Sequence, residues 1–174
     1  LASVLKGIFG DVGGGLDKQQ LGLNSQHPTS SGAPTPGNVV KPVGVTVFSP
    51  GGGADSPETA GKAITGAAGD AWSTDVYTDP APFPGFKSGV GLMLNLPQST
   101  TVASVSLNLT STGTAVQIRS AQTATPSSLD ATTVLTQPAT MKPGTNTITI
   151  SGAQPTQHLL IWISTLGTVD GKSK

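Results

Sequence analysis

The chain has 174 residues, no cysteine, and nine basic and nine acidic side chains that give a formal net charge of zero. The missing cysteines exclude disulfide bonds, thiol catalysis and cysteine-based zinc sites. The balanced charge, with Arg119 as the sole arginine, argues against nucleic acid as a partner, because nucleic-acid binding needs a basic surface.

Residues 1–42 hold eight glycines and four prolines, a composition that disfavours a packed core and predicts a flexible linker. The first nine residues place Leu1, Leu5 and Ile8 on one face of a helix. This face indicates either an interfacial membrane anchor or a helix end that frays into the linker. Because the chain starts with Leu1 and shows no signal-peptide pattern, we expect it to be part of a longer protein.

From residue 43 onward, apolar side chains recur at every second position and Gly, Pro, Ser and Thr clusters separate the runs. This pattern predicts half-buried antiparallel strands, and residues 159–163 are apolar on both faces, which predicts a central strand covered twice. The sequence therefore predicts an all-β antiparallel sandwich over residues 43–174. The alternating positions are Val43, Val45 and Val47; Val90, Leu92, Leu94 and Leu96; Val105, Leu107 and Leu109; Val116 and Ile118; and Ile148 and Ile150.

The segment Pro57 to Tyr77, PETAGKAITGAAGDAWSTDVY, precedes the first long strands. It predicts a short helical turn, then a glycine corner in which Gly66 supplies a left-handed cap. This order resembles the entry to the galactose-binding-like, discoidin-type β-sandwich, where an A-x-x-A-I-D-G-D…T-x-W-S segment occurs. The stretch AWSTDVYTDPAPFPGFKSGVGLML resembles, more narrowly, the C-terminal extracytoplasmic domain of actinobacterial MviN-type lipid II flippases.

That resemblance covers residue 43 to the end, and it implies a galactose-binding-like jelly roll on the extracytoplasmic face of the membrane. It also implies an upstream transmembrane segment that tethers the domain, and a place in peptidoglycan synthesis. Thr165 to Asp170 followed by Gly171 predicts a strand that leads into a turn, since Asp-Gly suits positive φ. Domains of this kind close the sheet with one more strand. That strand is missing here, so we expect either that the sequence is cut short of it or that an edge is left open near residues 158–170.

Aromatic residues gather between positions 72 and 86, where a ring face can stack on a pyranose while polar groups at the rim bind its hydroxyls. The alternative is that these rings plug one end of the sandwich, and Trp72 fits the core better than a ligand platform. The candidate ligand-binding residues are Trp72, Asp75, Tyr77, Phe83, Phe86 and Lys87.

Five of the nine acidic residues lie between positions 55 and 79, and calcium needs several oxygen ligands at once. Thr65 and Ala67 stand where the resembling motif offers carboxylates, which leaves Asp70 as the nearest candidate for a structural calcium. The alternative is a solvated acidic patch in which Asp55 and Glu58 cap the helical turn. No other cofactor is expected.

Nothing in the sequence marks an enzyme. The two histidines are His27 in the linker and His158 at a strand start, and G-x-S-x-G is absent. We therefore expect a non-catalytic module, and the resemblance to flippase domains implies that it recognises cell-wall glycan, a peptidoglycan precursor or a cell-wall protein. The alternative is a structural or protein-docking domain that uses the exposed sheet edge.

Overall fold

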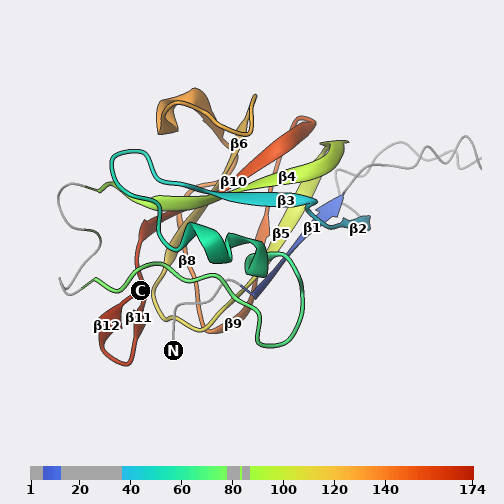
Figure 1. The fold of residues 1–174 in the computed structure, drawn as a ribbon. Coiled ribbons are helices and arrows are strands. Elements are labelled where there is room, and N and C mark those ends of the chain that lie inside the picture. The colour runs from blue at the N-terminus through green and yellow to red at the C-terminus, as the bar shows by residue number, and fades with distance from the viewer. Residues whose placement is uncertain (1–5, 13–36, 78–82, 84–86) are drawn as a thin grey trace, which may run out of the picture.

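The computed structural model describes residues 6–12, 37–77, 83 and 87–174, and within these ranges the chain is built almost wholly from strands (Figure 1). No helix in this part of the chain is long and apolar enough to span a membrane.

The larger sheet has the strand order β3-β4-β10-β6-β7, and β8 pairs with β6 beside this path. Every pairing in it is antiparallel. Its long central strands β4 and β10 pair over most of their length, with Leu159 opposite Leu94 and Ile161 opposite Leu92. The strands are β3 (Gly44–Phe48), β4 (Val90–Thr100), β6 (Ala115–Ala121), β7 (Thr132–Val134), β8 (Ala139–Thr140) and β10 (Thr156–Thr165).

The smaller sheet has the order β2-β1-β5-β9, again with antiparallel pairs only. Its strands are β1 (Lys6–Val12), β2 (Asn38–Val40), β5 (Val102–Leu109) and β9 (Gly144–Thr149). In Figure 1, β5, β9 and β1 lie on the far side of β3, β4 and β10. The molecule therefore has two stacked sheets.

The main core lies between the two sheets. Leu92, Leu94 and Ile161 of the larger sheet share one buried cluster with Val105 and Leu107 of the smaller sheet. Successive strand residues point to opposite faces, so the alternating apolar positions of the sequence reach this layer. Val43 is the exception: it precedes β3 and is 69% exposed. The predicted antiparallel β-sandwich is confirmed.

The larger sheet also buries its outer face. Met93, Leu160 and Trp162 form a second cluster, packed against Phe48 and Leu129. The ring of Phe48 meets Trp162 edge-on, with centroids 6.0 Å apart. The prediction that residues 159–163 form a central strand covered on both faces is confirmed, because β10 pairs with β4 and β6 and contributes to both clusters.

Two segments within residues 1–42, the predicted linker, are strands. β1 lies between β2 and β5, so its backbone groups are paired on both sides, and it pairs Gly10 with both Val40 and Val105. Lys6 to Phe9 are therefore strand rather than the predicted helix. These pairings with distant strands outweigh the local glycine and proline content, which is all that composition measures. Residues 1–5 and 13–36 lie outside the described ranges.

The predicted strand and turn at the C-terminus are confirmed, but the predicted open edge at 158–170 is wrong. β11 (Thr168–Val169) and β12 (Lys172–Ser173) form a hairpin whose turn residues Asp170 and Gly171 have φ of 50° and 75°. Residues 158–165 belong to β10, which has a neighbour on each side. Among the described strands, the edges of the larger sheet are β3, β7 and β8, and those of the smaller sheet are β2 and β9.

Candidate functional site

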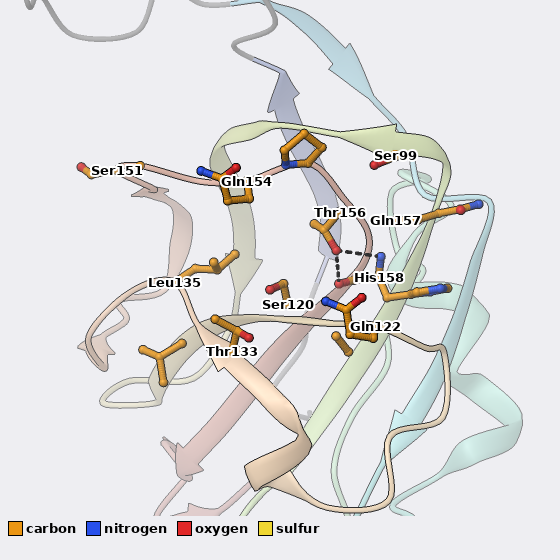
Figure 2. A pocket seen from close by; sticks show the side chains of 14 residues that line it. Ser99, Ser120, Gln122, Thr133, Leu135, Ser151, Gln154, Thr156, Gln157 and His158 are labelled. Atoms are coloured by element: carbon orange, nitrogen blue, oxygen red, sulfur yellow. Dashed lines mark hydrogen bonds between the residues drawn. The ribbon is translucent and has the colours of Figure 1, made fainter.

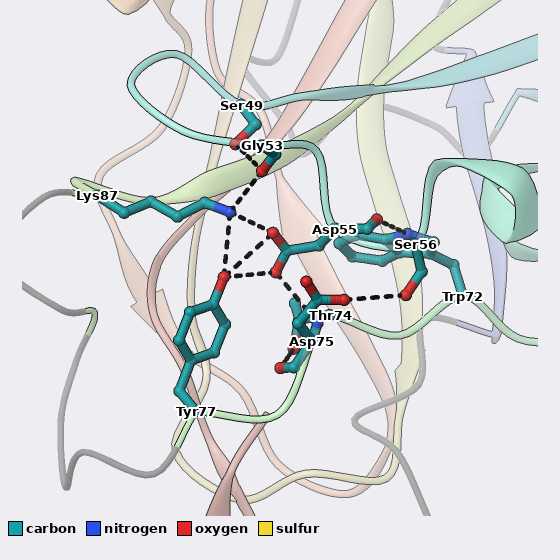
Figure 3. Close-up of polar contacts among 9 residues, drawn as sticks. All are labelled: Ser49, Gly53, Asp55, Ser56, Trp72, Thr74, Asp75, Tyr77 and Lys87. Carbon is teal, nitrogen blue, oxygen red and sulfur yellow. Dashed lines mark hydrogen bonds and ion pairs between the residues drawn. The ribbon is translucent and has the colours of Figure 1, made fainter.

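A buried carboxylate, that of Asp55, lies just before the 3₁₀ helix η2 (Pro57–Ala63), at the point where the loop after β3 turns back (Figure 3). Ser56 makes this turn with a φ of 43°. The side chain of Asp55 is fully buried, and it accepts hydrogen bonds from the hydroxyl of Tyr77 and from the backbone N–H of Asp75. The oxygen–oxygen distance from Tyr77 Oη to Asp55 Oδ2 is 2.9 Å, and the distance from Asp75 N to the same oxygen is 3.2 Å.

Lys87 completes this site from the segment that leads into β4. Its ammonium forms an ion pair with Asp55 Oδ1, and it donates to Gly53 O at 3.0 Å and to Tyr77 Oη at 3.1 Å. Lys87 is only 5% exposed. We call Asp55, Tyr77 and Lys87 the Asp55 cluster. It ties together three segments that are separated by up to 32 positions in the sequence.

Burial and partners act against each other on the protonation of the cluster. Desolvation is the largest influence on Lys87 and would lower its pKa, but hydrogen bonds to Asp55 and Tyr77 and the charge of Asp55 leave the pKa raised. Desolvation also raises the pKa of Tyr77, and Asp55 raises it further against the opposing effect of Lys87. The resting cluster therefore holds a charged lysine and a neutral tyrosine.

The structure brings several of the predicted ligand-binding residues to this cluster, with their polar groups turned inward. Tyr77 and Lys87 hydrogen-bond to Asp55, and the ring of Phe83 meets that of Tyr77 edge-on at 5.7 Å. Asp75 has an exposed side chain, which accepts from Ser56 Oγ at 3.3 Å. Phe86 lies outside the described residues. Glycan binding by this set stays a prediction.

Trp72 is a core residue, as predicted. It is 1% exposed, packs with Ala60 and Ala63 of η2 in the main core, and donates its indole N–H to the backbone oxygen of Asp55. The predicted helical turn and the left-handed Gly66, with φ of 72°, are also present.

Of the acidic residues between positions 55 and 79, Asp55 is buried, Glu58 and Asp75 are exposed, and Asp79 lies outside the described residues. Asp70 accepts from Thr65 Oγ1 at 2.8 Å, and the described residues contain no group of three His, Cys, Asp or Glu side chains that could hold a metal ion. The calcium hypothesis for Asp70 thus finds no ligand set there. Helix capping by Asp55 is wrong, because the N-cap residue is Ser56 and the Asp55 side chain points into the interior.

A second candidate site is a hollow of about 500 Å³ at the far end of β4 and the start of β10 (Figure 2). Sequence reasoning missed it, since its residues come from four segments that meet only in the fold. On one side lie Thr133 of β7 and Leu135, which directly follows β7. Gln154 and Thr156 lie opposite them. It is lined by Ser99, Ser120, Ala121, Gln122, Thr133, Val134, Leu135, Ser151, Gly152, Gln154, Pro155, Thr156, Gln157 and His158. We call it the polar hollow.

His158 lies at the margin of the polar hollow and is fixed by its neighbours. Its Nδ1 lies 2.8 Å from Asn95 Oδ1, and its backbone N–H donates to Thr156 Oγ1 at 3.2 Å. Since the amide oxygen of Asn95 is an acceptor, Nδ1 carries the proton in this contact. His158 has no acidic partner among these contacts, so the geometry does not build a charge-relay arrangement around it.

Neither a protein-family model nor a solved structure matches the chain. The resemblance to flippase domains therefore stays a hypothesis, and the functional argument depends on the geometry of the two candidate sites.

Proposed function

We propose that this chain is a non-catalytic recognition domain whose polar hollow binds an uncharged, hydroxyl-rich ligand, most specifically a stretch of cell-wall glycan. The observation that supports this proposal is the chemical character of the residues that line the hollow. Among the described residues that form it, none is Asp, Glu, Lys or Arg, whereas serine, threonine and glutamine side chains recur.

Hydroxyl and amide groups each donate and accept hydrogen bonds, as the hydroxyls and acetamido groups of a glycan do. The hollow also exposes apolar surface: Val134 is 44% exposed, and Leu135 and Pro155 lie beside it. Such surface can cover the C–H face of a sugar ring. Phosphate and carboxylate groups, by contrast, find no lysine or arginine in this lining, so the neutral glycan part of a precursor fits better than its pyrophosphate.

The broader setting is part of the same proposal. The likeness of residues 71–94 to the extracytoplasmic domain of MviN-type flippases supports a place outside the cell membrane, beside the machinery of peptidoglycan synthesis. A domain tethered there meets wall material at high effective concentration, so millimolar affinity suffices for function.

Titration with an uncharged oligomer of N-acetylglucosamine, followed by amide chemical shifts, tests the proposal. We expect saturable shifts at residues 120–122, 133–135 and 151–158. Gln154→Ala and Thr133→Ala should each weaken binding about three- to tenfold, which corresponds to the loss of one hydrogen bond. Thr145→Ala is the matched control, because Thr145 is an exposed threonine of β9 outside the hollow.

The same titration separates the alternatives. Shifts that appear at residues 73–77 and 87 while the polar hollow stays silent would contradict the hollow and favour the aromatic segment. The absence of any shift up to millimolar oligosaccharide would contradict glycan recognition by this domain.

A further inference from the structure

The ammonium of Lys87 has three N–H groups and three acceptors. They are Gly53 O at 3.0 Å, Tyr77 Oη at 3.1 Å and Asp55 Oδ1. If the proton on the third bond moves to Asp55 Oδ1, the other two N–H groups stay on Gly53 and Tyr77. The lone pair that is set free then faces the carboxyl group of Asp55. This arrangement presents a neutral amine as a nucleophile to one carboxyl carbon.

The two oxygens of Asp55 are in different surroundings. Oδ1 is paired with Lys87 and lies 3.1 Å from Tyr77 Oη, whereas Oδ2 is nearer to that hydroxyl, at 2.9 Å, and also lies 3.2 Å from the backbone nitrogen of Asp75. Two donors directed at one oxygen stabilise the negative charge that develops there when a nucleophile adds to the carbon. Oδ2 is thus placed as the oxyanion, and Oδ1 as the oxygen that leaves.

From this geometry we propose that the chain joins Lys87 to Asp55 through an amide bond between Nζ and Cγ, with loss of one water. The step begins with transfer of a proton from Nζ to Oδ1. The nitrogen lone pair then forms the N–C bond while the C=O π pair moves to Oδ2, held by Tyr77 and Asp75. When that pair returns, the C–Oδ1 bond breaks, and the Oδ1 hydroxyl takes a second of the three ammonium protons and leaves as water. The third proton stays on nitrogen as the amide N–H. No oxidant, cofactor or second substrate is needed.

Burial supplies the driving force. Asp55 is 0% and Lys87 5% exposed, so both ions have lost their hydration, which costs free energy. The amide is neutral and removes that cost, and the water that forms leaves to solvent. Two groups held in contact react at effective concentrations of about 10⁵ M or more, which compensates for the small fraction of the pair that is neutral at any moment. This inference does not depend on glycan binding.

The intact mass of the denatured 174-residue chain tests the proposal directly. We expect a mass lower than the sequence mass by one water. After trypsin digestion we expect a branched peptide that contains Asp55 and an uncleaved Lys87, because trypsin does not cut after an acylated lysine. A full sequence mass together with normal cleavage after Lys87 would overturn the proposal.

Variants test which residues form the cross-link and which group assists it. Lys87→Arg should show the full mass of its sequence, whereas Lys62→Arg, at an exposed lysine of η2, should still lose water. Tyr77→Phe keeps the ring and removes the oxyanion donor, so we expect a smaller cross-linked fraction at equal sample age. A Tyr77→Phe chain that loses water as fast as the natural chain would overturn the role given to that hydroxyl. If Lys87→Arg does not fold, the mass of the natural chain still decides.

Discussion

The indole Nε1 of Trp72 donates a hydrogen bond to the backbone carbonyl of Asp55 at 3.0 Å. Asp55 is therefore held twice, by its backbone against the main core and by its side chain in the Asp55 cluster. Because Trp72 packs with η2, the polar cluster and the end of the hydrophobic core form one unit. Loss of the carboxylate should therefore lower the stability of the whole fold rather than that of one loop.

Asp55→Ala should lower the free energy of unfolding by about 3–5 kcal/mol, because the variant keeps a buried Lys87 ammonium that has neither its counter-charge nor the proposed amide bond. Urea unfolding followed by tryptophan fluorescence measures this change. Asp75→Ala is the matched control: its carboxylate is exposed, and we expect a change within about 1 kcal/mol. Equal effects of the two substitutions would show that the Asp55 cluster contributes no more to stability than an exposed carboxylate does.

Tyr77 is the single tyrosine of the chain, so the absorbance of ionised phenol reports on this residue alone. Its pKa is raised in the fold above the ordinary 10.0, mainly by desolvation. As pH rises above 10.0, the unfolded chain loses its phenol proton first, so this contribution to stability is present below that pH and lost above it. We expect a titration midpoint above 10.0 in the folded protein and a return toward 10.0 in urea. A folded midpoint at or below 10.0 would contradict the burial of the hydroxyl.

Gly91 allows the outer face of the larger sheet to close. A Cβ on Gly91 would lie 2.7 Å from Leu160 Cδ1 and 2.9 Å from Ile161 O, closer than side-chain atoms tolerate. Gly91→Ala should therefore destabilise the fold by about 1–3 kcal/mol. Gly61→Ala is the control, since a Cβ there meets nothing within 4 Å and alanine favours the helix. Thermal unfolding of both variants measures the difference, and a Gly91→Ala midpoint equal to that of Gly61→Ala would contradict it.

Arg119 fastens the turn before β7 to the outer face of the larger sheet. Its guanidinium donates to Thr132 Oγ1 at 2.6 Å, to Gln117 Oε1 at 2.8 Å and to the backbone oxygens of Leu129 and Thr132 at 3.2 and 3.3 Å. A lysine ammonium cannot replace these bonds, because the acceptors are arranged around the planar guanidinium group. Arg119→Lys should cost about 1–3 kcal/mol and speed amide exchange at residues 131 and 135. Lys142→Ala, at an exposed position, should change neither, and unchanged exchange in Arg119→Lys would refute the fastening role.

Period-two alternation was enough to predict the strands of the core. Leu92 and Leu94, or Leu159 and Ile161, point to the same face because successive strand side chains alternate, which is a local property of the backbone. The turn at Asp170 and Gly171 follows in the same way from residues that accept positive φ.

Tertiary structure alone decided the rest. Lys6–Val12 became a sheet strand because β2 and β5 lie on either side of it, and no local signal reports such distant partners. The same holds for Asp55. The sequence shows an acidic residue before a helical turn, but its side chain is buried only because Tyr77 and Lys87, which are distant in the sequence, contact it. The polar hollow likewise exists only where separate loops converge. The direction of a strand side chain depends on the local backbone, which neighbouring residues reveal. The residues that it contacts depend on which strands pair across the whole chain.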